Sequence, residues 1–164
     1  MNIFYLHHHP LVAAQYHCDK HVPKMILESA QMLSIVARTN GFDVGYNMNV
    51  NGAFSKHPCT LWTGQSRRHY DFVCELGDYL CDEFYLRFGS KEHKTRATIT
   101  ELTADDIRQK IPDTGWHSPP QCMPPEYKGV DTIEAYRKYY QVEKAYFAKY
   151  DKGRNAPYWF KVEE

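Results

Sequence analysis

Residues 17–28 form the densest group of titratable side chains in the sequence, which reads His17-Cys-Asp-Lys-His-Val-Pro-Lys-Met-Ile-Leu-Glu28. Imidazoles and carboxylates can transfer protons, and lysines at a helix start can bind phosphate together with free backbone N–H groups. An ordinary capped helix start is the competing interpretation. The candidates for acid–base chemistry are Asp19, His21 and Glu28, and those for phosphate binding are Lys20 and Lys24.

Histidines near the N-terminus raise the question of a metal site, because His7, His8, His9, His17, Cys18 and His21 lie within fifteen residues. Adjacent histidines in an extended segment point in alternate directions, however, and the sequence has no His-Glu-x-x-His or Cys-x-x-Cys motif. It also lacks a Gly-x-Ser-x-Gly elbow and a phosphate-binding glycine loop. We therefore expect no metal or other cofactor, no serine hydrolase and no nucleotide hydrolysis.

Length and composition favour a single domain over residues 1–164, with 43% hydrophobic and 24% charged residues. No apolar run approaches the ~18 residues of a membrane span, and residues 1–6 are too short for a secretory signal, so we expect a cytoplasmic monomer. Cys74 and Cys81 would lie ~10 Å apart on one helix and are expected to be buried, reduced thiols. Because the net charge is zero, any DNA site must be a local basic face.

Hydrophobic periodicity predicts an all-α fold, a compact helical bundle with long irregular loops. The expected helices span about residues 10–18, 22–38, 57–88 and 131–152, and a short capped helix is expected near 103–106. The third helix should point Leu61, Phe72, Val73, Leu76, Leu80 and Phe84 inward. Residues 41–55 read as a loop or a small hairpin and residues 90–130 as irregular, and the proline-rich segment 119–127 predicts an extended ribbon across the bundle.

Three further groups of side chains could contact DNA. Arg67 and Arg68 could bind phosphate, although an exposed basic turn is the commoner outcome for such a pair. The last helix is rich in cations, among them Lys144 and Lys149. The tail that follows contains Tyr158 and Trp159, whose rings either pack into the core or form a stacking wall for a base.

Several short motifs occur in a fixed order along most of the chain. They are Lys20-His-Val-Pro-Lys24 followed by Glu28, His57-Pro58 with Trp62, Cys81-Asp-Glu83 with Arg87-Phe-Gly89, Pro124-x-Glu-Tyr127 and Pro157-Tyr-Trp-Phe160. In this order they resemble elements of the pyrimidine-dimer DNA glycosylases of the endonuclease V type and their phage and bacterial relatives. The resemblance implies a protein of a bacterial or phage-infected cell that acts on double-stranded DNA.

The resemblance further implies a DNA glycosylase that flips a nucleotide out of the duplex and attacks the sugar C1′ with an α-amino group, supported by a glutamate. Here Met1 would supply that amine, or a lysine such as Lys24 would replace it. His21 occupies the position of the family's glutamate, so Glu28 or Asp19 would supply the carboxylate. These departures point to a damaged or phage-type modified base as the substrate, with His57 among the residues facing DNA.

Two other functions fit the same scaffold. A transferase that modifies a flipped base would also need base extrusion and a general base, but would leave the strand intact. A noncatalytic DNA-binding protein would explain a histidine at the glutamate position. The product formed on DNA distinguishes all three.

Overall fold

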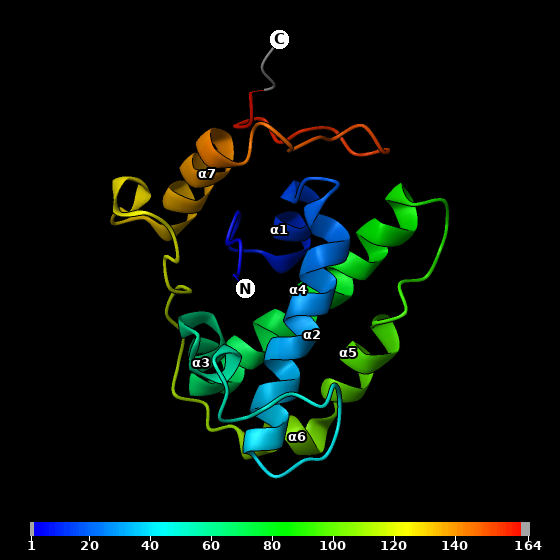
Figure 1. Cartoon of the computed structure of the whole chain (residues 1–164), viewed down its shortest axis with the longest axis vertical. Coiled ribbons are helices and arrows are strands. Elements are labelled where there is room, and N and C mark those ends of the chain that lie inside the picture. The colour runs from blue at the N-terminus through cyan, green and yellow to red at the C-terminus, as the bar shows by residue number, and fades with distance from the viewer. Residues whose placement is uncertain (1, 162–164) are drawn as a thin grey trace.

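The computed structural model describes residues 2–161, and within them the regular secondary structure is helical, with no strand (Figure 1). The predicted all-α class is confirmed. Seven α-helices and two 3-10 turns follow one another in this order: α1 Pro10–Tyr16, α2 His21–Thr39, η1 Phe54–Lys56, α3 Pro58–Gln65, α4 Arg67–Arg87, α5 Arg96–Leu102, α6 Asp105–Lys110, η2 Pro125–Tyr127 and α7 Thr132–Glu143.

Helices α2 and α4 cross at the centre of the molecule and each contribute more residues to the core than any other helix (Figure 1). The apolar residues whose helical spacing predicts α2 are all buried, namely Val22, Met25, Ile26, Leu33 and Val36. The opposite face of α2 keeps Lys24 exposed and Glu28 half-buried. Because these apolar residues must face the core, they set the rotation of α2 about its axis. Lys24 and Glu28 therefore lie on the side of α2 that faces solvent.

The prediction of a single helix over residues 57–88 is wrong, because Ser66 separates α3 from α4. Ser66 has an extended backbone, with φ −150° and ψ 147°, and its hydroxyl caps α4 by accepting from the Arg68 N–H at 3.3 Å. The same hydroxyl accepts from the Thr114 N–H at 3.2 Å. The break turns α3, which leaves Leu61 53% exposed instead of buried.

The last helix is shorter than expected. Asp131 caps α7 by accepting from the Glu134 N–H at 3.0 Å, but the helix ends at Glu143 rather than near residue 152. The segment after it runs past the end of α1 and the start of α2 (Figure 1). There the Lys149 carbonyl accepts from the Asp19 N–H at 2.8 Å, a tertiary contact that a continued helix could not make.

Residues 111–131 form an extended ribbon, apart from the η2 turn, and it includes the predicted segment 119–127. The Trp62 indole N–H donates to the His117 carbonyl at 3.1 Å, and the Tyr136 hydroxyl accepts from the Cys122 N–H at 3.2 Å. The ribbon therefore joins α3 to α7. One expectation was incomplete, since residues 90–110 hold helix α5 as well as the short helix α6, which begins at Asp105.

No helix in residues 2–161 is long and apolar enough to cross a membrane. Cys74 and Cys81 are both buried and unpaired, as expected.

Candidate functional site

The polar row of α2 brings three of the candidate residues together. Lys20 and Lys24 are exposed, and Glu28 follows them on the same face at intervals of four residues. Four helical residues span about 6 Å, so Glu28 lies about 12 Å along the axis from Lys20. This arrangement places two cations and one carboxylate along a solvent-facing line.

His57 joins this row from α3. It caps α3 by accepting from the Cys59 N–H at 3.1 Å, which fixes the imidazole beside α2. Burial lowers the pKa of His57, while the negative charge of Glu28 raises it in part. The two side chains, predicted separately as a catalytic carboxylate and a DNA contact, are therefore electrostatic neighbours.

The N-terminal segment reaches the same region. The Asn2 amide donates to the Cys122 carbonyl at 3.0 Å, and its Oδ1 accepts from the Tyr136 hydroxyl at 2.9 Å. Asn2 Oδ1 also lies 3.8 Å from the Cys59 sulfur. The described chain thus begins between the ribbon, α3 and α7. Met1, the candidate source of the amine, lies outside the described residues.

His21 lies in the interior, in contrast to the lysines that flank it. It is 3% exposed, stacks on Phe4 with ring centroids 4.5 Å apart, and its Nδ1 lies 2.8 Å from the Tyr140 hydroxyl. Burial, reinforced by nearby positive charges, lowers the pKa of His21 to about 2. The imidazole is therefore neutral at physiological pH and is held in an aromatic cage rather than in an open cleft.

A lysine cluster surrounds the start of α2. Lys20, Lys24 and Lys144 each lie close enough to His21 for their charges to lower its pKa. The ammonium of Lys20 lies 4.8 Å from the Phe147 ring centroid, and that of Lys144 lies 5.9 Å from it.

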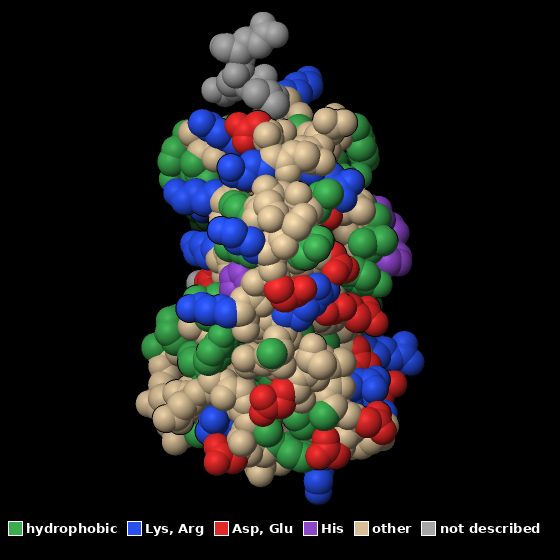
Figure 2. All heavy atoms as spheres, turned by 90° about the vertical axis from the view of Figure 1, so that its right-hand side faces the viewer, with side chains coloured by type: hydrophobic (Ala, Val, Ile, Leu, Met, Phe, Trp, Pro, Cys, Tyr) green, Lys and Arg blue, Asp and Glu red, His purple; other side chains and the backbone are tan. Residues whose placement is uncertain are grey.

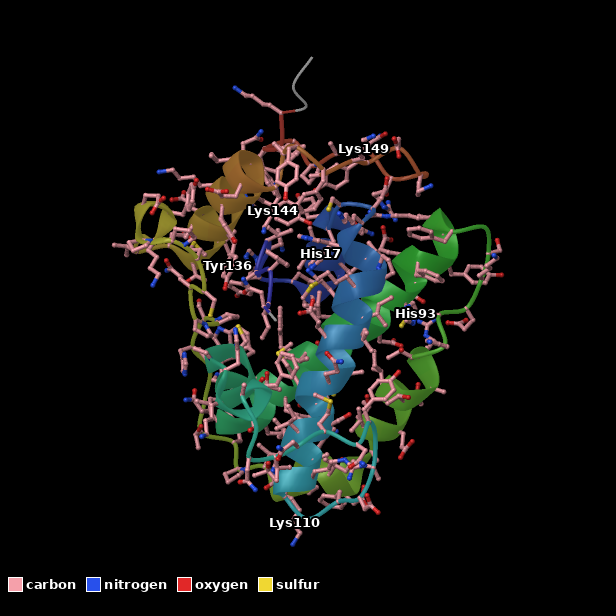
Figure 3. All side chains as sticks on the ribbon, viewed as in Figure 1. His17, His93, Lys110, Tyr136, Lys144 and Lys149 are labelled. Atoms are coloured by element: carbon pink, nitrogen blue, oxygen red, sulfur yellow. The ribbon has the colours of Figure 1, made fainter. Side chains whose placement is uncertain are left out.

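An apolar pocket of about 300 Å³ opens beside this cluster. Phe88, Phe147 and Pro23 contribute its apolar surface, and the polar residues around it are Asp19, Lys20, Lys149, Asp151 and Lys152. Figure 3 places Lys144 and Lys149 together at one end of the molecule, with Lys110 at the opposite end. Basic side chains also gather over the upper part of the face in Figure 2, whereas acidic ones dominate its lower part.

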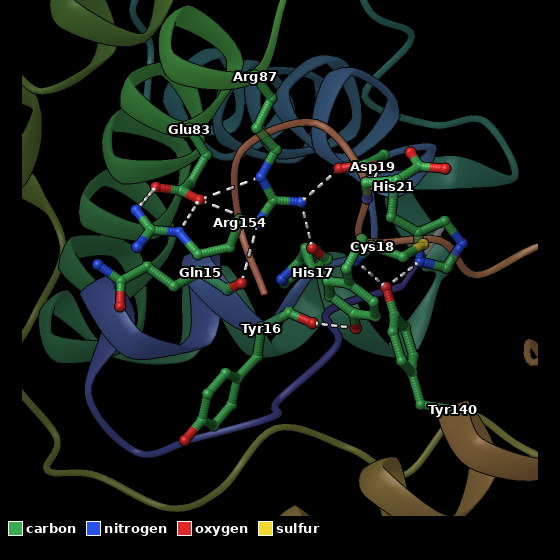
Figure 4. Close-up of polar contacts among 12 residues, drawn as sticks. Gln15, Tyr16, His17, Cys18, Asp19, His21, Glu83, Arg87, Tyr140 and Arg154 are labelled. Atoms are coloured by element: carbon green, nitrogen blue, oxygen red, sulfur yellow. Dashed lines mark hydrogen bonds and ion pairs between the residues drawn. The ribbon is translucent and has the colours of Figure 1, made fainter. Parts of the chain in front are cut away.

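Asp19, the other candidate carboxylate, belongs to a buried ionic network centred on Arg87 (Figure 4). The guanidinium lies 3.2 Å from Asp19 and 2.9 Å from Glu83, and its side chain is 0% exposed. It also donates to the backbone carbonyls of Gln15 and His17. Arg154 completes the network with a 2.8 Å ion pair to Glu83.

Replacing Arg87 with methionine is expected to destabilise the fold by about 3–5 kcal/mol, because two buried carboxylates would lose their shared counter-charge. Denaturant unfolding measures this change. Arg68→Ala is the matched control, since Arg68 is 62% exposed and pairs with Asp113 at the surface. Its expected cost is below about 1 kcal/mol. Equal losses for the two variants would contradict a structural role for the network.

The basic turn at 67–69 is largely occupied by contacts within the protein. The Arg67 guanidinium donates to the carbonyls of Arg108 and Ile111, at 2.9 and 3.2 Å, and Arg68 pairs with Asp113. His69 is buried and stacks on Trp62 with centroids 4.1 Å apart. The structure therefore places this turn apart from the lysine cluster and gives it a role in holding the ribbon.

The aromatic tail divides between interior and surface. Trp159 packs edge-on against Tyr16, with centroids 5.7 Å apart, whereas Tyr158 is 81% exposed. Arg137 lies over both tail rings, 5.4 Å from Trp159 and 5.8 Å from Tyr158. Trp159 therefore packs against the core, as one interpretation of the tail expects, whereas the ring of Tyr158 lies at the surface.

Comparison of the chain with protein-family models, curated proteins and solved structures found no match. The resemblance to endonuclease V-type glycosylases consequently remains a prediction from the motifs, and function must be inferred from the arrangement of the side chains.

Proposed function

We propose that this protein binds duplex DNA and excises a damaged or modified base from a flipped nucleotide. The observation that carries the proposal is the alignment of Lys20 and Lys24 with Glu28 on the exposed face of α2, with His57 beside the carboxylate. Phosphate-binding cations and a proton-accepting group are two requirements of base excision, and here they share one helix face.

The lysine cluster supports contact with the phosphate backbone. Protein–DNA affinity depends on local cations that replace counterions, so a concentrated cluster can bind DNA although the net charge is zero. The adjacent pocket of about 300 Å³ has aromatic walls of the kind that accept an unstacked base. Exposed Tyr158 is a further ring that could stack on DNA.

The role proposed for Glu28 is proton transfer at the sugar C1′, either to activate water or to support an imine formed by an amine of the chain. Its half-buried position at the edge of α2 suits this role better than the fully enclosed network of Asp19. His57 would then orient the carboxylate, and neutral His21 would hold Tyr140 and Phe4 behind the lysine cluster.

The first test uses duplex oligonucleotides that each carry one lesion: a pyrimidine dimer, uracil, an alkylated base, or a hydroxymethylated or glucosylated pyrimidine. Alkali-labile sites on one of them are expected, and borohydride trapping shows whether an amine of the protein forms an imine. An intact strand of altered mass would show that the protein modifies the base instead of excising it. Binding without any product would establish a noncatalytic DNA-binding protein and overturn the proposal.

Lys149→Ala is expected to reduce DNA affinity and to make it less dependent on salt, because each phosphate contact contributes about 0.9 to the slope of log K against log salt concentration. The double variant Lys24→Ala/Lys149→Ala should lose about twice that slope. Lys110→Ala, at the opposite end of the molecule, should leave the slope unchanged. Fluorescence anisotropy over a salt series measures all three, and equal slopes would exclude Lys24 and Lys149 as phosphate contacts.

A further inference from the structure

Three residues with soft metal-binding atoms meet at the start of α3. One ligand atom each from His57, Cys59 and Cys122 lies within 4.8 Å of the others. His57 and Cys59 come from the cap and first turn of α3, while Cys122 comes from the ribbon that crosses it. This cluster is separate from the N-terminal histidines considered in the sequence.

The spacing of the sulfurs fits a tetrahedral metal centre. The Sγ atoms of Cys59 and Cys122 are 3.7 Å apart. Two thiolates bound to Zn²⁺ at about 2.3 Å in tetrahedral geometry lie about 3.8 Å from one another. A disulfide requires about 2.05 Å, so the pair is held at the ligand distance rather than the bonding distance.

The two sulfurs share one hydrogen bond and lie against the N-terminal segment. The Cys59 Sγ lies 3.8 Å from Asn2 Oδ1. The hydrogen bond from Cys59 lowers the pKa of Cys122 to about 7, whereas the same contact and burial raise the pKa of Cys59, so a bound metal must displace the Cys59 proton. The Asn2 amide donates to the Cys122 carbonyl and the Cys122 N–H donates to the Tyr136 hydroxyl, which holds the backbone of Cys122 in place.

We propose that His57, Cys59 and Cys122 bind a zinc ion through one imidazole nitrogen and two thiolates. Binding releases the thiol protons to solvent, and one imidazole nitrogen of His57 donates its lone pair to the ion. Three protein ligands leave a fourth tetrahedral position for water. The inference is independent of base excision, because it rests only on the geometry of the three ligands.

Cobalt(II) titration of the reduced, metal-free protein tests the site. One equivalent is expected to produce the visible d–d bands of tetrahedral coordination and a thiolate charge-transfer band, and zinc should displace it stoichiometrically. Cys122→Ser should weaken binding at least about tenfold, with His57→Gln also weakening it. Cys122 is half-buried on the ribbon, so its serine variant should keep the helical circular dichroism of the wild type.

Cys81→Ala is the matched control, because Cys81 is a buried thiol on α4 outside the cluster and its loss should leave the cobalt spectrum unchanged. Absence of the thiolate bands in the folded, reduced wild type would overturn the proposal. Wild-type cobalt affinity and an unchanged thiolate band in Cys122→Ser would overturn it as well. A Cys59–Cys122 disulfide found by peptide mass spectrometry, with no metal bound after reduction, would assign the pair to redox chemistry instead.

Discussion

Replacing Glu28 with glutamine is expected to lower the single-turnover rate of base excision by 10²–10⁴-fold, the usual contribution of a positioned general acid or base. Glutamine keeps the size of the side chain but cannot accept a proton at neutral pH. DNA affinity should be retained, since the variant removes a negative charge from the lysine row. Rapid-quench measurement of alkali-labile sites on the preferred substrate gives the rate.

Glu101→Gln is the control for this experiment, because Glu101 is an exposed carboxylate on α5. Its rate should match that of the wild type, and both variants should unfold cooperatively with a helical spectrum. Glu28→Gln with a wild-type rate would remove the carboxylate from the chemistry. If excision persisted in that variant, the reacting group would be Asp19 or an amine of the chain acting alone.

The second large effect is acid unfolding below about pH 6.5, the ordinary pKa of histidine. Burial lowers the pKa of His17 to about 4 and that of His21 to about 2. Both rings stay neutral in the folded protein and must take up protons on unfolding, so the unfolded state binds more protons and stability falls as the pH falls. Each histidine contributes about 1.4 kcal/mol per pH unit, or together about 5 kcal/mol between pH 6.5 and 4.5.

Chemical denaturation at a series of pH values measures this slope. His21→Asn should reduce it by about 1.4 kcal/mol per pH unit, whereas His8→Asn should change it little because His8 is exposed. Arg154 and Arg87 lower the pKa of Glu83, which makes the folded protein lose further stability as the pH falls. The raised pKa of Asp19 has the opposite effect on stability. A direct check is NMR: imidazole signals of His17 or His21 that titrate near pH 6.5 in the folded protein would refute the explanation.

The elements that could be predicted are those whose apolar residues face one core. The stripe of α2 continues over five turns, so its bounds and its exposed row followed from periodicity. The break between α3 and α4 at Ser66 could not be predicted, because apolar residues continue on both sides of it. The decisive contact is with Thr114 of the ribbon. The end of α7 likewise depends on the distant contact between Lys149 and Asp19.

The same distinction applies to the candidate site. Lys20, Lys24 and Glu28 could be placed on one face because residues four apart are neighbours on a helix. The burial of His21 could not be predicted, since Phe4 and Tyr140, which enclose it, come from opposite ends of the chain. The Glu83–Arg87 pair was visible as a four-residue spacing, but its link to Asp19 required the fold.

The two buried tyrosines of α7 have a consequence for the order of folding. Tyr136 bonds to Asn2, 134 residues away, and Tyr140 accepts from the N–H of Cys18, 122 residues away. Contacts this distant along the chain form late, because a long loop must first be closed. During synthesis the ribosome must release nearly the whole polypeptide before Phe4 and His21 can be enclosed. Until then the beginning of the chain exposes aromatic surface, so nascent chains halted before α7 should be the species that chaperones capture.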